Sequence, residues 1–90
     1  MKVIFRKTKE GEIIAFLPEV LCYHGNIMSY MHIGQHGETS LQYYYKTEKA
    51  SENEYAELLE ELTEIYSGCT LEIKQRLNYN DLTTKAWSFN

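Results

Sequence analysis

The sequence predicts an α+β domain: a four- to five-stranded, mainly antiparallel sheet with one helix, about residues 52–66, packed on one face. Its 90 residues are enough for one hydrophobic core and too few for a second. Short apolar stretches that alternate every two residues fill the first half of the chain, and one later stretch repeats apolar residues at helical spacing. The expected order is β-β-β-β-α-β in a single domain over residues 1–90, with 78–90 as an irregular tail or a short edge strand.

Residues 2–7 and 12–17 are expected to form a hairpin, because two apolar runs flank a short polar turn that ends at Gly11. In the second run apolar side chains fall on both faces, which is typical of a central strand: Ile13, Ala15 and Leu17 alternate with Ile14 and Phe16. Pro18 ends this strand because it has no amide hydrogen to donate to a neighbour.

Two further strands are expected at residues 27–33 and 41–46, with residues 34–40 as the loop between them. In the second of these, Leu41, Tyr43 and Tyr45 oppose Gln42, Tyr44 and Lys46. A fifth strand is expected at residues 70–77, with Leu71, Ile73 and Leu77 pointing inward. In the tail, alternation around Trp87 and Phe89 indicates the short edge strand.

The helix is predicted from its first turn and its apolar stripe. Ser51 and Glu54 have the spacing of a capping box, in which each side chain bonds to the other residue's amide. Gly68 is expected to end the helix in the left-handed conformation. The apolar stripe consists of Tyr55, Leu58, Leu59, Leu62, Ile65 and Tyr66.

Charge is concentrated on this helix. The chain has a net charge of −4, and residues 52–66 contain six glutamates and no lysine or arginine. The acidic face consists of Glu57, Glu60, Glu61 and Glu64. Two interpretations stay open: a face that meets a basic partner protein, or a solvated face that keeps the helix in water.

Composition and cysteine usage limit the class of protein. The acidic balance opposes direct nucleic-acid binding, and the longest apolar run, 13–17, is too short to span a bilayer. The N-terminus lacks the apolar core of a signal peptide, so a cytoplasmic location is expected. Cys22 and Cys69 show no metal-ligand spacing and are expected to be reduced and buried.

The candidate functional stretch is Ser29-Tyr30-Met31-His32-Ile33-Gly34-Gln35-His36-Gly37. His32 and His36 have the four-residue spacing of a helical zinc pair, and His24 could supply a third nitrogen ligand. The glycines interrupt any helix, however, and in an extended segment the two histidines would lie ~13 Å apart.

Three other interpretations of this stretch stay open. Two glycines could aim backbone amides at an anion, and a histidine could act as a general base. No nucleophile elbow, paired carboxylates or cofactor fingerprint accompanies it, so no enzyme activity and no cofactor are expected. In the third interpretation the glycines only shape a hairpin bend, and the histidines and tyrosines pack or hydrogen-bond within the fold.

Four segments carry a resemblance to known proteins: Lys2–Lys7, Leu17-Pro18-Glu19, the run from Ser29-Tyr30 through His32-Ile33-Gly34-Gln35-His36-Gly37, and Glu54–Leu58. In these segments the chain resembles a family of small uncharacterised proteins found in gut bacteria and in their phages and conjugative elements. The resemblance covers roughly residues 2–77 and implies an accessory protein of mobile DNA. It implies no activity.

The function expected from these observations is a non-enzymatic interaction protein that binds a bacterial host protein, with inhibition of a host defence system as one such role. The expected contact residues are Tyr30, His32, Gln35, His36 and Tyr44, and the acidic helix face is the second contact surface. The alternative is a small histidine-dependent domain that binds a metal, an anion or another ligand through His24, His32 and His36. A homodimer is compatible with either.

Overall fold

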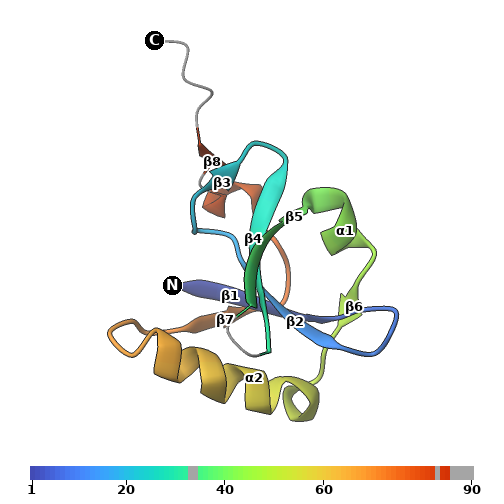
Figure 1. Cartoon of the computed structure of the whole chain (residues 1–90), viewed down its shortest axis with the longest axis vertical. Helices are drawn as coiled ribbons and strands as arrows, with labels where there is room; N and C mark the ends of the chain where they lie inside the picture. Colours follow the sequence, from blue (N-terminus) through green and yellow to red (C-terminus); the bar gives the residue numbers. More distant parts are fainter. Residues whose placement is uncertain (33–34, 83, 86–90) are drawn as a thin grey trace.

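The computed structural model describes residues 1–32 and 35–82, and the backbone of residues 84–85. The fold is α+β, as predicted, with a mixed sheet packed against one main helix, α2 (Figure 1). The elements are β1 (Lys2–Lys7), β2 (Ile13–Leu17), β3 (Cys22–Tyr23), β4 (Asn26–Met31), β5 (Gln35–Ser40), α1 (Leu41–Tyr45), β6 (Glu48–Lys49), α2 (Glu52–Ile65), β7 (Glu72–Lys74), a 3-10 turn (Tyr79–Asp81) and β8 (Thr84–Lys85).

Among the described residues the main sheet has six strands, in the order β5-β4-β2-β1-β6, with β7 also paired to β1. The predicted β1–β2 hairpin is confirmed, and β2 is central because it pairs with both β1 and β4. Ile4 pairs with Phe16 of β2 and with Lys74 of β7, so β7 lies along the other edge of β1, parallel to it. β3 and β8 form a separate parallel pair.

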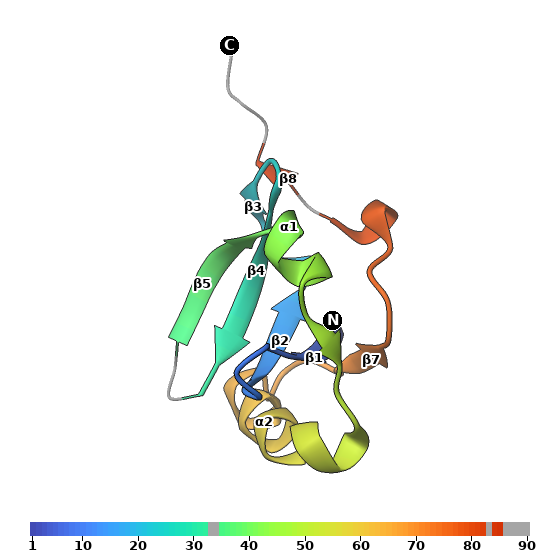
Figure 2. The same ribbon diagram turned by 90° about the vertical axis from the view of Figure 1, so that its right-hand side faces the viewer.

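Strand alternation gives the sheet two buried faces. One face packs against α2 and consists of Val3, Phe5, Ala15, Leu17 and Tyr30, with Leu58 and Leu62 from the helix. The opposite face consists of Ile4, Ile14, Phe16 and Ile27, with Tyr44 from α1. Both layers are visible in Figure 2, where α2 lies below the sheet and α1 lies against its upper part.

The start of α2 follows the predicted capping box. Ser51 Oγ accepts a hydrogen bond from the Glu54 amide at 3.4 Å, and the Glu54 carboxylate accepts one from the Ser51 amide at 2.9 Å. The predicted end at Gly68 is wrong: the amide of Tyr66 caps the helix on the Leu62 carbonyl, and among the described glycines only Gly11 and Gly25 have a positive φ. Within the described part of the chain, no helix is long and apolar enough to cross a membrane.

The prediction of a loop at residues 34–40 is wrong for residues 35–40, and the prediction of a strand at 41–46 is also wrong; residue 34 lies outside the described residues. Residues 35–40 form β5, which pairs with β4 from Asn26 opposite Ser40 to Met31 opposite Gln35. Residues 41–45 form the short helix α1, because Ser40 Oγ accepts from the Tyr43 amide at 3.1 Å and caps the turn.

The C-terminal part is also less regular than expected. The strand predicted at 70–77 is confirmed only at Glu72–Lys74, and Ile73 is 39% exposed instead of pointing inward. In the tail, Thr84–Lys85 pairs with β3, whereas Trp87 and Phe89 lie outside the described residues. Cys22 is buried as expected, but Cys69 is exposed, so the expectation of burial is wrong for Cys69.

Candidate functional site

The β4–β5 hairpin holds the histidine motif against α2. Tyr30 of β4 lies directly opposite His36 of β5, and cross-strand partners project from the same face of a sheet. Their ring centroids are 4.7 Å apart. Because Tyr30 belongs to the buried layer that contacts Leu58 and Leu62, both rings lie on the α2 side of the hairpin.

Tyr30 and His32 share one carboxylate on the helix. The fully buried Tyr30 donates a hydrogen bond from its hydroxyl to Glu61, and the second carboxylate oxygen of Glu61 lies 3.0 Å from His32 Nδ1. The side chain of His32 is 56% exposed and that of Glu61 30% exposed. Glu61 therefore connects the interior of the sheet to an imidazole at the surface.

His36 makes a second connection to the same helix. Its Nε2 lies 2.9 Å from the hydroxyl of Tyr66, and the two rings are nearly perpendicular at a centroid distance of 6.0 Å. Burial raises the pKa of the Tyr66 hydroxyl above its usual value, so the hydroxyl stays protonated and is able to donate a hydrogen bond. The motif thus attaches the hairpin to α2 at two points.

Two of the five predicted contact residues are not at the surface. Tyr30 has no exposed area, since it fills the core under α2. Tyr44 is only 5% exposed and lies in the opposite core, where its hydroxyl accepts a hydrogen bond from the Leu77 amide at 3.0 Å. Their assignment as contact residues is wrong, whereas His32, Gln35 and His36 are exposed.

The alternative metal site does not assemble. His24 lies in the turn between β3 and β4, and His32 follows the other end of β4, which separates them by roughly 20 Å of extended strand. His36 is bonded to Tyr66. In residues 1–32 and 35–82, no group of three histidine, cysteine or acidic side chains is placed to hold a metal ion.

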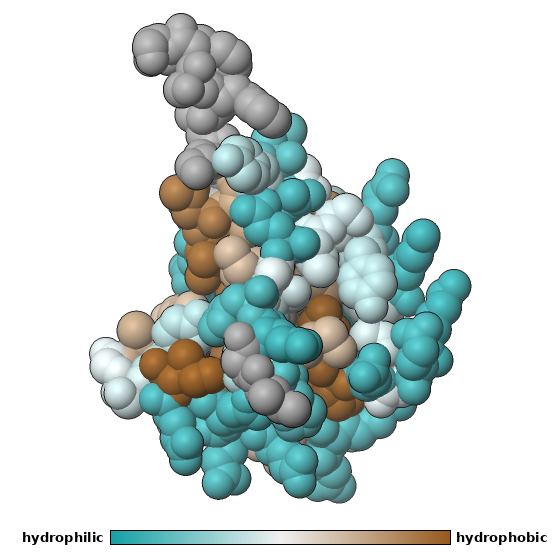
Figure 3. All heavy atoms as spheres, viewed as in Figure 1, coloured by the Kyte–Doolittle hydropathy of each residue, from teal (hydrophilic) through white to brown (hydrophobic). Residues whose placement is uncertain are grey.

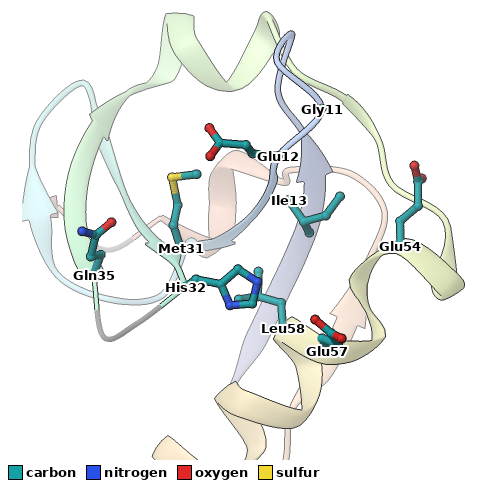
Figure 4. A pocket seen from close by; sticks show the side chains of 9 residues that line it. All are labelled: Gly11, Glu12, Ile13, Met31, His32, Gln35, Glu54, Glu57 and Leu58. Atoms are coloured by element: carbon teal, nitrogen blue, oxygen red, sulfur yellow. The ribbon is translucent and has the colours of Figure 1, made fainter.

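A pocket of about 470 Å³ opens beside His32, between the β1–β2 turn, the β4–β5 hairpin and the first turns of α2 (Figure 4). Its apolar wall consists of Ile13, Met31 and Leu58. Carboxylates come from Glu12 in the turn and from Glu54 and Glu57 on the helix. The pocket therefore combines an apolar surface with acidic groups on two different elements.

A second pocket of about 380 Å³ continues along α2 and is lined by His32 and the four glutamates of the predicted acidic face, Glu57, Glu60, Glu61 and Glu64. His32 and Glu57 line both pockets, which we together name the acidic groove. Figure 3 shows hydrophilic side chains gathered on the side of the molecule where α2 lies. Of the four predicted glutamates, only Glu61 is turned inward, toward Tyr30.

The carboxylate of Glu54 is occupied within the fold. It lies 2.7 Å from the Lys7 ammonium and also accepts from the Ser51 amide, and these two hydrogen bonds lower its pKa from 4.5 to about 2. By contrast, within the described residues the carboxylates of Glu12, Glu57, Glu60 and Glu64 make no hydrogen bond or ion pair. These four are available to a ligand.

Sequence reasoning missed the larger pocket. Glu12 and Leu58 are 46 positions apart, and no local pattern relates a turn residue to a helix residue at that separation. The only signals were the opposite charges of Lys7 and Glu54, whose ion pair brings the β1–β2 hairpin to the helix N-terminus. The sequence predicts Tyr66 as part of the apolar stripe, and the structure shows that its hydroxyl also lies within hydrogen-bond distance of His36.

The chemistry of the acidic groove favours cations. Six glutamates and no lysine or arginine are among the residues that line it, so it attracts positive charge and repels the phosphates of nucleic acids. No protein-family model, no curated protein and no solved structure matches the chain.

Proposed function

We propose that the protein is a non-enzymatic interaction domain whose acidic groove binds a basic segment of a partner protein. The observation that carries the proposal is the pair of adjoining pockets, which present six carboxylates without a lysine or arginine in their lining: Glu12, Glu54, Glu57, Glu60, Glu61 and Glu64. Complementary charge of this kind accelerates association and selects among partners.

The unoccupied carboxylates give this surface its binding capacity. Glu57, Glu60 and Glu64 lie at helical spacings of three and four, where like charges repel one another. A bound lysine or arginine relieves that repulsion, so part of the binding energy comes from the charge arrangement of the unbound helix. Salt at about 0.15 M screens charges beyond roughly 8 Å, and binding should therefore weaken as salt rises.

The histidine motif gives the groove its shape. Its bonds to Glu61 and Tyr66 hold the β4–β5 hairpin over α2, and this fixes Met31, His32 and Gln35 as one wall of the larger pocket. The resemblance of the same motif to proteins of gut bacteria and their mobile elements supports a bacterial host protein as the partner. Inhibition of a host defence system in the cytoplasm is the biological role that we attach to this proposal.

The proposal is tested by affinity capture from a bacterial lysate with charge-matched variants. A triple Glu57→Gln, Glu60→Gln, Glu64→Gln variant removes three groove carboxylates. The control, Glu10→Gln, Glu48→Gln, Glu52→Gln, removes three exposed carboxylates elsewhere and has the same net charge. Captured proteins are identified by mass spectrometry, and the strongest is purified for binding measurements over a salt series.

We expect the unmodified protein and the control to capture the same basic protein, and the groove variant to bind it at least about tenfold more weakly. The affinity should also fall as salt increases. Equal binding by the groove variant would contradict the proposal, and so would a partner whose affinity does not depend on salt.

A further inference from the structure

We propose that the larger pocket of the acidic groove is an anchor site for one arginine side chain of the partner protein. This inference rests on the proposed function and specifies the chemistry of its contact. The pocket's volume of about 470 Å³ lies within the usual range of ligand pockets, ~300–1,000 Å³, so it can receive a long side chain together with adjoining backbone.

The apolar wall suits the alkyl stem of such a side chain. Ile13 and Met31 are half-buried and present the apolar surface, and Leu58, which is 1% exposed and belongs to the core under α2, lies beside them. Long cationic side chains bury their methylene groups on surfaces of this kind and keep their charge at the edge. Met31 can adapt its shape to the incoming stem because it is unbranched.

The charged edge comes from two separate elements. Glu12 follows the β1–β2 turn and Glu57 lies on α2, and Figure 4 shows them on different sides of the pocket with His32 between the strands and the helix. Neither carboxylate has a hydrogen bond or ion pair among the described residues. At Gly11, which also lines the pocket, a φ of +86° favours glycine.

A guanidinium fits this arrangement better than an ammonium. Its planar group has five N–H donors, so it can bond to two carboxylates that approach from different directions, whereas an ammonium is a compact point charge. A guanidinium can also stack on the exposed imidazole of His32. Gln35 adds an amide carbonyl as a further acceptor on the hairpin side.

The position of the second pocket points to a protein chain as the source of the guanidinium. The two pockets share His32 and Glu57, so a chain anchored in the larger pocket can continue along Glu60 and Glu64. A small free cation bound in the larger pocket would leave Glu60 and Glu64 without a contact. The extended acidic surface therefore favours a basic segment in which one arginine is inserted and its basic neighbours lie along α2.

The test is an NMR titration of the ¹⁵N-labelled protein with acetyl-Gly-Gly-Arg-Gly-Gly-amide. The matched probe carries citrulline, which has nearly the same shape as arginine and no charge, and a third probe carries lysine. We expect saturable shifts of the Gly11, Met31 and Leu58 amides with the arginine peptide. The lysine peptide should bind more weakly, and the citrulline peptide should cause no saturable shift.

Variants show whether the predicted carboxylates are responsible. Glu12→Gln and Glu57→Gln should each weaken the arginine peptide about tenfold, the loss expected for one charge-assisted hydrogen bond. Glu52→Gln, on the same helix but in neither pocket of the acidic groove, should change its affinity by less than about twofold. An equal effect of Glu52→Gln would overturn the anchor site.

Two other results would also overturn the inference: equal shifts with the citrulline peptide, or affinity for the lysine peptide at least equal to that for arginine. The same holds if no shift appears at about 10 mM arginine peptide, a concentration at which even a weak contact is detectable. Partner capture that survives a failed titration rejects the arginine anchor and keeps the proposed function. A successful titration without a captured basic partner rejects the proposed function.

Discussion

Replacing Tyr30 by phenylalanine tests whether the β4–β5 hairpin is held on α2 by its buried hydroxyl. Tyr30 is 0% exposed, and its hydroxyl donates to the Glu61 carboxylate. A hydrogen bond to a charged group contributes roughly 1.5–3 kcal/mol, and we take the lower end, about 1.5 kcal/mol, because the Glu61 side chain is 30% exposed. For a domain of this size each kcal/mol lowers the melting temperature by about 4–8 °C, which gives a decrease of roughly 6–12 °C.

A double-mutant cycle tests whether this loss of stability comes from the hydrogen bond between Tyr30 and Glu61. Glu61→Ala removes the carboxylate, and the double variant should lose about 1 kcal/mol less than the sum of the single losses, measured by urea unfolding followed by circular dichroism. Tyr79→Phe is the control, because this tyrosine is 58% exposed and, among the described residues, its hydroxyl bonds only to Tyr45. A loss below about 0.5 kcal/mol for Tyr30→Phe, or strictly additive losses, would refute the reasoning.

Three further predictions concern the helix and the cysteines. Leu62→Ala should lower the free energy of unfolding by about 2–5 kcal/mol in urea titrations, since Leu62 has no exposed area. The lowered pKa of Glu54 predicts that its stabilising effect is present above pH 4.5 and is lost as the pH falls through about 2, visible as a declining melting temperature. In thiol labelling, Cys69 should react in the folded protein and Cys22 only after unfolding, because Cys22 is 2% exposed and burial raises its pKa.

Each of these predictions has its own control. Leu21→Ala removes a leucine that is 50% exposed and should cost less than about 0.5 kcal/mol. In Glu54→Gln the decline of stability between pH 4.5 and about 2 should become shallower, and an unchanged decline would contradict the role of the Lys7 ion pair. Equal labelling rates of the two thiols in the folded protein would show that Cys22 is not protected.

The parts of the fold that were predicted correctly are those in which local pattern and tertiary packing agree. In β2 both faces are apolar, and both are buried, one under α2 and one under α1. In α2 the capping box and the apolar stripe specify the start and the buried side. In these segments the apolar pattern of the residues themselves indicates which side is buried, so the sequence alone predicts the element and its orientation.

The parts predicted wrongly depend on neighbours far along the chain. β5 contains a glycine and has no alternating apolar face, because it is an edge strand with mostly exposed residues, and its pairing is set by β4. Residues 41–46 alternate in a way that is typical of a strand, yet a cap at Ser40 and the fit of Tyr44 against Phe16 make the helix α1 more favourable. Five residues are too few for helical spacing to be recognised.

In the candidate site, too, some features follow from local pattern and others depend on neighbours far along the chain. The histidines and the glutamates of the site can be told apart by what each contributes to stability and to affinity. Because His36 bonds to Tyr66 and lies against Tyr30, His36→Ala should lower both the stability and the affinity for the partner, through movement of the hairpin wall. Glu57 is exposed and has no bond within the described fold, so Glu57→Gln should lower the affinity and leave the melting temperature within about 2 °C. If His36→Ala weakened binding at unchanged stability, the histidine would itself contact the partner, and its assigned role as a support of the groove would be wrong.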